Sequence, residues 1–282
     1  MGPQIHCYTI VKFAKREMFQ YIDEASGDLV HVRLPTGSTE WKAYVAPLLR
    51  LVAQHLKEKG WFADSYVALD EVVPEMSRIA RDFVAEIVPD FKFAEASNIH
   101  PRNYSDISID NYSQILWHDL ETKETFVPDE FLASVKARKA AGKITTFYVC
   151  PEPQHPNSWL KSPLVESEWI GIYSAAKEFS GFLRWAGFSW SRDPFCEVSA
   201  GPFPSGENHL LYPGALASTR WEILRDGFED WEKIRLIRES GKMAPGLKEV
   251  LDGLDFSVME TADEDTYRSS VRKVLQFLNA DE

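Results

Sequence analysis

The sequence has little of what a disulfide-stabilised, membrane-spanning or nucleotide-binding protein needs. Its 282 residues include only Cys7, Cys150 and Cys196, and an odd number excludes a disulfide scaffold that uses all three. No window approaches the roughly 18 consecutive apolar residues of a membrane-spanning helix. The Gly-rich phosphate-binding motifs GxGxxG and GxxxxGK are absent. We therefore expect no membrane span and no nucleotide cofactor.

Metal-binding motifs are also lacking, and the charge balance is acidic. The seven histidines form no HExxH or HxH motif, so we expect no metal site. A net charge of −12 repels a phosphate backbone, and we expect no nucleic-acid partner. The start MGPQIHCYTI lacks the pattern of a signal peptide, so we expect none in this chain, and a secreted or periplasmic location stays open if the chain is a fragment.

Aromatic residues are abundant, at 13% of the chain. Several stand in polar, Gly- and Pro-rich segments instead of along helical stripes: Trp117, Trp159, Trp185, Trp190 and Tyr212. Sugars present apolar C–H faces that stack on aromatic rings, so these residues fit a carbohydrate site. Because Trp is largely buried on average, packing in the core is the alternative for each of them.

Strands and helices alternate along the chain, which predicts an α/β fold with a parallel sheet. The predicted strands begin at Ile5, Ser65, Phe91, Asp106, Ile144 and Gly181, with a β-hairpin over 19–34 and helices over 38–59, 74–87, 128–141 and 164–179. Long loops follow the strands, as in a (β/α)8 TIM-type barrel, whose site is built at the carboxyl ends of its strands. An open doubly wound sheet is the alternative, although its usual Gly-rich first turn is missing.

No linker interrupts the chain, so we predict a single barrel-like domain over residues 1–282. Its last part consists of three helices that begin near Ser218, Gly246 and Thr261. Six strands are two fewer than a closed barrel contains. We therefore expect the barrel to be incomplete in this chain.

The segment SYVALDEVVPEM, from Ser65 to Met76, places Asp70 and Glu71 side by side where a buried strand ends. At the carboxyl end of a barrel strand such residues are typical of catalysis. The alternative is structural, because Asp70 could cap the helix that begins near Pro74 and Glu71 could be an acid in its first turn. Glu95 and Asp110 end the next two predicted strands, so a two-carboxylate glycosidase site is a further alternative.

Several segments together resemble the catalytic domain of glycoside hydrolase family 123. They are HLKEKGWFADSYVALDE, GKITTFYVCPEPQHPNSW, GFLRWAGFSWSRDPF, HLLYPG and STRWEILRDGFEDWEKIR. The resemblance extends from about His6 to Arg238 and depends on the order and spacing of these segments.

The resemblance implies a (β/α)8 barrel and a β-N-acetylgalactosaminidase that releases terminal β-linked N-acetylgalactosamine from a glycan or glycolipid. It implies a retaining mechanism in which the 2-acetamido oxygen of the substrate attacks the anomeric carbon. Glu71 would be the general acid and then the general base, and Asp70 would orient the acetamido N–H. Such a division of roles needs a protonated Glu71 and an ionised Asp70.

Further residues are expected to bind the substrate if the resemblance holds. Tyr148 would hydrogen-bond the acetamido oxygen, as a tyrosine does in related acetamido-directed hydrolases. Trp185 and Trp190 would wall the sugar subsite, and Tyr212 would line the pocket. The polar side chains that we expect to bind sugar hydroxyls are Asn98, His100 and Asn111. For all of these, ordinary core packing or turn chemistry is the alternative.

The chain departs from the family pattern in two ways. Gly206-Glu207 stands where members commonly have Gly-Asp, and a longer acid there would change the sugar preference if it binds a hydroxyl. The Asp-Glu pair follows strand four in the family, whereas here only one sheet strand precedes it. We therefore expect the first strands to be missing, and either an N-terminal region or self-association to complete the barrel. A non-catalytic carbohydrate-binding barrel fragment remains an alternative.

Overall fold

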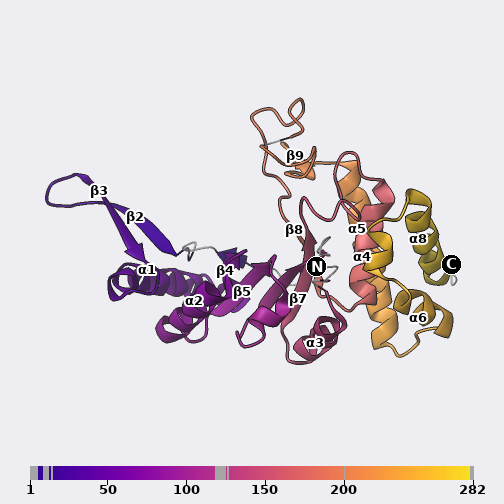
Figure 1. The fold of residues 1–282 in the computed structure, drawn as a ribbon, viewed down its shortest axis with the longest axis horizontal. Helices are drawn as coiled ribbons and strands as arrows, with labels where there is room; N and C mark the ends of the chain where they lie inside the picture. Colours follow the sequence, from indigo (N-terminus) through magenta and orange to yellow (C-terminus); the bar gives the residue numbers. More distant parts are fainter. Residues whose placement is uncertain are drawn as a thin grey trace. The chain divides into compact units, whose positions relative to one another are not determined.

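The computed structural model describes residues 6–8, 13, 15–117, 125, 127–199 and 201–279. The chain forms two compact units, unit 1 over residues 1–113 and unit 2 over residues 114–282 (Figure 1). The division between the units falls inside strand β6 (Asn111–Ile115). Each unit is described here by itself, and the single domain predicted above stays a prediction.

Unit 1 combines parallel strands, two long helices and a hairpin. Its elements are β1 (His6–Tyr8), β2 (Arg16–Ile22), β3 (Leu29–Pro35), α1 (Thr39–Glu58), η1 (Phe62–Asp64), β4 (Ser65–Asp70), α2 (Pro74–Ile87), β5 (Lys92–Ser97) and η2 (Pro101–Tyr104). Strand β4 pairs in parallel with β1 on one side and with β5 on the other. Asp70 lies opposite Ala96 in this register, and Leu69 lies opposite Glu95.

Helices α1 and α2 form where the sequence predicts them. The Ser38 hydroxyl caps α1 by accepting the N–H of Trp41 at 3.2 Å. Trp41 is fully buried and meets the edge of Phe83 on α2, with ring centroids 4.8 Å apart. This aromatic contact joins the two helices in the core of unit 1.

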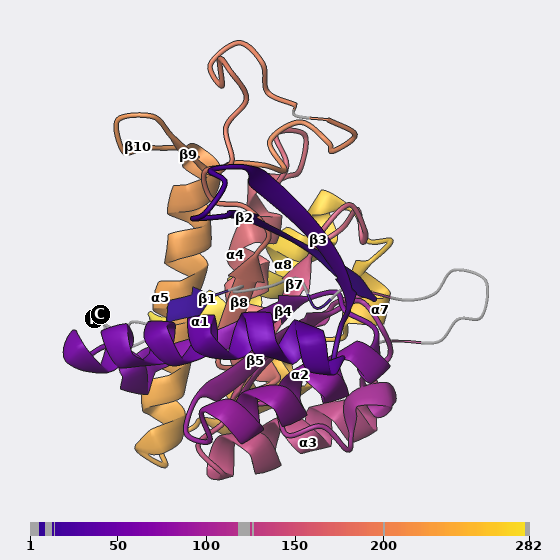
Figure 2. The same cartoon turned by 90° about the vertical axis from the view of Figure 1, so that its left-hand side faces the viewer.

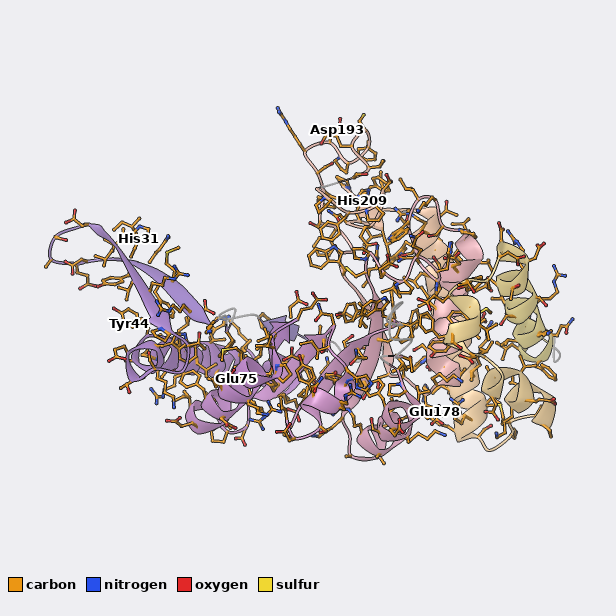
Figure 3. The ribbon with its side chains drawn as sticks, viewed as in Figure 1. His31, Tyr44, Glu75, Glu178, Asp193 and His209 are labelled. Carbon is orange, nitrogen blue, oxygen red and sulfur yellow. The ribbon has the colours of Figure 1, made fainter. Side chains whose placement is uncertain are left out.

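The predicted hairpin is confirmed as β2 and β3, which pair antiparallel. The turn is held by Asp23, whose Oδ1 accepts the N–H groups of Ala25 and Ser26. Tyr44 of α1 stacks on Phe19 of β2 with ring centroids 5.3 Å apart, and Figure 3 labels Tyr44 beside the hairpin that carries His31. The hairpin is therefore joined to α1 by aromatic packing.

Unit 2 is mainly helical. Its elements after β6 are α3 (Asp129–Ala140), β7 (Ile144–Val149), α4 (Leu164–Ala176), β8 (Gly181–Arg184), β9 (Leu211–Tyr212), β10 (Leu216–Ala217), α5 (Thr219–Glu239), α6 (Pro245–Asp252), α7 (Phe256–Met259) and α8 (Glu264–Leu278). Strands β7 and β8 are parallel, and β9 and β10 form a small antiparallel ribbon near the start of α5 (Figure 2).

Helix α4 is the centre of unit 2 and is buried on nearly all sides. It packs against α5 and α8 (Figure 1). Gly171 of α4 and Gly227 of α5 let the two backbones approach closely, because a Cβ on Gly171 would lie 2.2 Å from the Gly227 carbonyl. Trp169 of α4 meets the ring edge of Tyr267 on α8 at 5.6 Å. Side chains on nearly every side of α4 are buried, as is expected of a helix in a core.

The prediction of a strand over residues 106–110 is wrong. Ile107 and Ile109 are buried and Asp106 is exposed, so apolar and polar residues alternate as in a strand. The backbone of this segment nevertheless forms no strand. Both oxygens of Asp106 accept hydrogen bonds from Arg78 on α2 at 2.7 Å. The strand is the next segment, β6, whose last four residues are all buried and show no alternation. Short elements that the sequence did not predict are η1, η2, α7, β9 and β10.

The α/β class is confirmed by the parallel pairs in each unit. The described residues contain the six sheet strands that the sequence predicts, with the one shift at β6. They do not form a complete (β/α)8 barrel, and its completion by other residues or by a second copy stays a prediction. Within the described ranges, no helix is long and apolar enough to cross a membrane.

Replacing Gly171 with Ala should destabilise unit 2, because the added methyl would collide with the Gly227 backbone. Overpacking of this kind costs about 3 kcal/mol when the backbone has to shift. Thermal unfolding followed by circular dichroism would measure the effect. Gly187→Ala is the matched control, since a Cβ there meets nothing within 4 Å. Equal midpoints for the two variants would contradict the close approach of α4 and α5.

Candidate active site

The candidate site in unit 1 lies at the carboxyl end of β4, where Asp70 is the last strand residue. Glu71 follows with a φ of +53°, in the left-handed region. Its N–H donates to the carbonyl of Ala96 at 2.8 Å, so the hydrogen bonding to β5 continues one residue past the strand. A left-handed non-glycine residue costs roughly 1–2 kcal/mol. Such residues persist where the surroundings hold them, and they cluster at functional sites.

Asp70 does not cap the following helix. Helix α2 begins at Pro74, its N-cap is Val73, and no side chain caps it. The acid in its first turn is Glu75, which Figure 3 labels. The structural alternative for the Asp70–Glu71 pair is therefore wrong in both of its parts. Both side chains are exposed to solvent at the strand end.

The residue after the pair, Val72, is held by groups from more distant parts of unit 1. Its carbonyl accepts the hydroxyl of Tyr104 at 2.6 Å, and its N–H donates to the carboxyl of Glu95. Glu95 also accepts the hydroxyl of Ser77 at 2.9 Å, from the second turn of α2. The turn that carries Glu71 is thus tied to β5, η2 and α2.

Glu95 is a buried carboxyl, with 2% of its surface exposed. Its Oε1 has no hydrogen-bond partner. Burial raises the pKa of Glu95 to about 8; the Ser77 and Val72 donors oppose this rise and the nearby charge of Asp70 adds to it. Glu95 therefore holds a proton at neutral pH. Partial burial also raises the pKa of Asp70. A raised pKa favours the protonated form, whereas the expected role needs an ionised Asp70.

Sequence reasoning had considered Glu95 only as a partner in a two-carboxylate site, and it missed Tyr104 and Ser77. Burial raises the pKa of Tyr104 to about 12, so its hydroxyl remains a donor across the physiological range. One signal was available, because Ser77 is a polar residue on the buried face of α2. No pattern in the sequence connects Tyr104 with Val72.

The other predicted residues of unit 1 lie at both ends of its strands. Asn98 and His100 follow β5, on the same side as the Asp70–Glu71 pair. His100 accepts the N–H of Arg102 through Nδ1 and caps η2. Asn111, in contrast, opens β6.

The hydrogen bonds of Asp110, the residue before Asn111, show at which end of the strands Asn111 lies. Asp110 donates its N–H to the Phe93 carbonyl, and its Oδ2 accepts the Phe93 N–H. Phe93 is the second residue of β5, so Asp110 and Asn111 lie at the amino end, away from Asp70.

The predicted residues of unit 2 include three accessible aromatic rings and one buried tyrosine. Tyr148 lies in β7 and is 4% exposed. Trp185 and Trp190 are each 44% exposed. The indole N–H of Trp190 donates to the Leu211 carbonyl at 2.7 Å, and Tyr212 stacks on Phe195. The structure thus brings Trp190 and Tyr212 to one loop region.

A buried polar cluster lies within the same part of unit 2. Glu207 has no exposed surface. Its Oε1 accepts a hydrogen bond from Nη1 of Arg184 at 3.0 Å, and its Oε2 accepts one from the indole N–H of Trp159. Its carboxylate is engaged within the protein, whereas the sequence had raised the idea that it binds a sugar. Trp159 is itself buried, so the core alternative is correct for this residue.

Arg220 completes the cluster by donating to the carbonyls of Ser158, Gly206 and His209 at 2.7–2.9 Å. His209, labelled in Figure 3, is 2% exposed, and its Nε2 has no hydrogen-bond partner. Burial and the charges of Arg220 and Arg184 lower the pKa of His209. The cluster ties the segment around residue 207 to α5 and β8.

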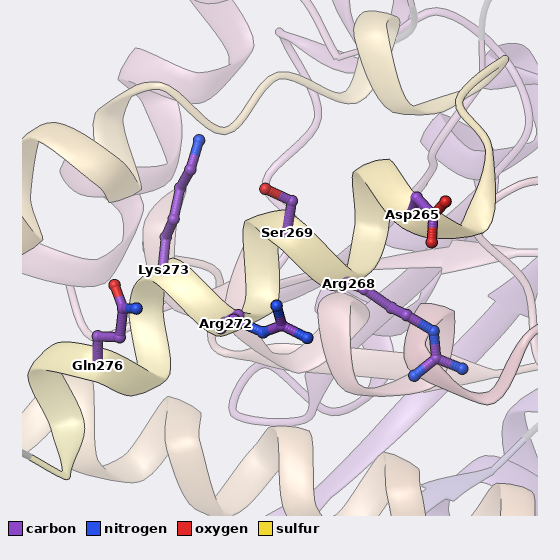
Figure 4. A pocket seen from close by; sticks show the side chains of 6 residues that line it. All are labelled: Asp265, Arg268, Ser269, Arg272, Lys273 and Gln276. Carbon is purple, nitrogen blue, oxygen red and sulfur yellow. The ribbon is translucent and has the colours of Figure 1, made fainter.

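A shallow hollow elsewhere in unit 2 runs along helix α8 (Figure 4). It is lined by Asp265, Arg268, Ser269, Arg272, Lys273 and Gln276, and contains none of the predicted site residues. Among the described residues, no group of three or more His, Cys, Asp or Glu side chains is arranged to hold a metal ion.

Comparisons with known proteins agree with the resemblance noted in the sequence. A solved structure of a family 123 glycoside hydrolase from Clostridium perfringens, whose structural analysis addresses glycolipid glycan hydrolysis, matches with a TM-score of 0.79. The two chains are 24% identical over 99% of this chain and 52% of the other, so this chain spans about half of that protein. A search of curated proteins found no match.

The family comparison covers most of the chain. The model described as "Glycoside hydrolase 123, catalytic domain" matches residues 1–237, which include both the Asp70–Glu71 pair and the aromatic segment of unit 2. The chain therefore belongs to glycoside hydrolase family 123.

Proposed function

We propose that this chain is a β-N-acetylgalactosaminidase catalytic domain that hydrolyses terminal β-linked N-acetylgalactosamine by a retaining, substrate-assisted mechanism. Glu71 is the general acid and base, and Asp70 is the partner of the acetamido group. The substrate class is a glycan such as that of a glycolipid, in keeping with the hydrolysis addressed for the Clostridium perfringens relative. The domain belongs to the (β/α)8 barrel type.

The observation that carries this proposal is the backbone at the end of β4. The strand ends at Asp70, and Glu71 adopts a left-handed conformation before α2 begins at Pro74. Neither carboxyl caps the helix, and both are exposed. Two adjacent acids at a strand's carboxyl end, on a backbone held in an unfavourable conformation, support a catalytic role more than a structural one.

In the first step, the acetamido oxygen of the sugar attacks the anomeric carbon while Glu71 donates its proton to the glycosidic oxygen. The bond between the anomeric carbon and that oxygen breaks, and an oxazolinium ion forms. Asp70 accepts a hydrogen bond from the acetamido N–H and stabilises its developing positive charge. No protein nucleophile is required, which is the recognised exception to the two-carboxylate rule.

In the second step, the Glu71 carboxylate removes a proton from water as the water oxygen attacks the anomeric carbon. The oxazolinium ring opens and regenerates the acetamido group, and Glu71 is protonated again for the next cycle. Each step inverts the anomeric carbon, so the overall result is retention.

The two-carboxylate alternative meets two obstacles. Glu95 is buried and turned toward Ser77 of α2, so it has no access to a sugar. Asp110 binds the backbone of Phe93 at the amino end of β5. Neither residue is therefore a good nucleophile for a substrate held at Glu71.

Replacing Glu71 with Gln should lower kcat on an aryl β-N-acetylgalactosaminide by about a thousandfold, because general acid–base catalysis contributes roughly 10²–10⁴. Asp70→Asn should lower kcat as well, since an amide cannot stabilise the charged acetamido group. Steady-state kinetics would measure both effects. Glu75→Gln is the matched control, because Glu75 is an exposed acid four residues further along. Near-normal rates for Glu71→Gln would refute the assignment.

A substrate without the 2-acetamido group distinguishes the proposed mechanism from its alternatives. The aryl β-galactoside should be hydrolysed at least about a thousandfold more slowly than the acetamido sugar, because an intramolecular nucleophile has a high effective concentration. Similar rates would favour a two-carboxylate glycosidase. Sugar binding in calorimetry without turnover of either substrate would favour a non-catalytic binding module.

A further inference from the structure

Glu95 is a buried acid that the mechanism above does not use. It is 2% exposed, and no ion pair among the described residues includes it. A buried carboxyl without a cation is unfavourable unless hydrogen bonds compensate for it. Here the Ser77 hydroxyl and the Val72 N–H donate to it, while its Oε1 has no partner. Its place in the fold therefore requires an explanation other than stability.

The contacts of Glu95 converge on the residue next to Glu71. Glu95 accepts the N–H of Val72, and the Tyr104 hydroxyl donates to the Val72 carbonyl at 2.6 Å. On the other side, the N–H of Glu71 donates to the Ala96 carbonyl at 2.8 Å. Both backbone groups of Val72 and the N–H of Glu71 are thus fixed. We call Glu95 and Tyr104 the Val72 clamp.

We propose that Glu95 is a positioning residue for the general acid and base: through Val72 it holds Glu71 in its left-handed conformation and so fixes the direction of the Glu71 carboxyl. This inference rests on the function proposed above. Without the clamp, the turn relaxes toward ordinary backbone angles, and the carboxyl moves away from the glycosidic oxygen. A misplacement of about 1 Å is enough to reduce a rate by about 100-fold.

The charge of Glu95 fits this role. The titratable groups that act on it or on the clamp are Asp70 from β4, Glu71 from the turn and Tyr104 from η2, while Arg78 of α2 is paired with Asp106. With a pKa of about 8, Glu95 is neutral at pH 7 and adds no negative charge beside Asp70. The ordinary pKa of this carboxyl, 4.5, applies in the unfolded chain, so Glu95 ionises there at a lower pH than in the folded protein. The folded state therefore loses stability as the pH rises from 4.5 through about 8.

Two variants with opposite expectations test the inference in the intact chain. Glu95→Leu removes the acceptor of the Val72 N–H but keeps an apolar volume, so kcat on the aryl β-N-acetylgalactosaminide should fall about 100-fold with KM changed less than about threefold. Its melting temperature at pH 8 should equal or exceed that of the wild type. Glu95→Gln keeps an acceptor for the Val72 N–H and should retain most of the wild-type kcat.

Tyr104→Phe removes the other half of the clamp and should also lower kcat with little change in KM. If Glu95→Leu fails to fold, Tyr104→Phe tests the clamp in its place. Glu168→Gln in unit 2 is the matched control, because burial raises the pKa of that carboxyl too and it has no contact with the clamp. Its kcat should equal that of the wild type.

A purely structural role predicts a different result, namely lower stability with kcat unchanged per folded molecule. That outcome for both Glu95→Leu and Tyr104→Phe would overturn the inference. If the wild type itself has no turnover, the proposed function fails. Amide hydrogen exchange then tests separately whether Glu95 holds Val72. Faster exchange of the Val72 N–H in Glu95→Leu would support the clamp, and unchanged exchange would refute it.

Discussion

The turn between β4 and α2 is the constraint on which the candidate site depends. It has to leave the sheet within three residues, and it does so through a left-handed glutamate at position 71. A glycine would adopt this conformation at no steric cost, so a glutamate here carries strain that the surrounding contacts have to offset. Two hydrogen bonds of Val72 compensate for the strain: its N–H donates to Glu95, and its carbonyl accepts the Tyr104 hydroxyl.

The same turn creates an electrostatic problem that the fold solves by burial. Asp70 and Glu71 lie at the end of β4, and Glu95 lies opposite Leu69 on the neighbouring strand β5. Three ionised carboxylates there would repel one another. Because burial keeps Glu95 protonated, it accepts the hydrogen bonds of Ser77 and Val72 without adding charge. The carboxyl whose pKa burial raises to about 8 is thus Glu95, which hydrogen-bonds the turn from within the fold.

The sequence predicted those parts of the site that depend on local pattern. The end of β4 at Asp70 and the start of α2 at Pro74 follow from an apolar run and a proline at the first helical position. The clamp could not be predicted, since Tyr104 follows Val72 by 32 residues and meets it only through tertiary packing. The misplaced strand over 106–110 has a related cause, because buried isoleucines in an irregular segment imitate the alternation of a strand.

Unit 2 shows a comparable division between a buried support and an accessible surface. Trp185 and Trp190 follow β8 in an irregular segment, and Tyr212 ends the short strand β9. Glu207, Arg184 and Arg220 hold this segment from within through charge-assisted hydrogen bonds. Loop aromatics bind a ligand well only when they are already ordered, because ordering them on binding costs affinity. Glu207 therefore belongs to this buried support, whereas the rings of Trp185 and Trp190 are exposed.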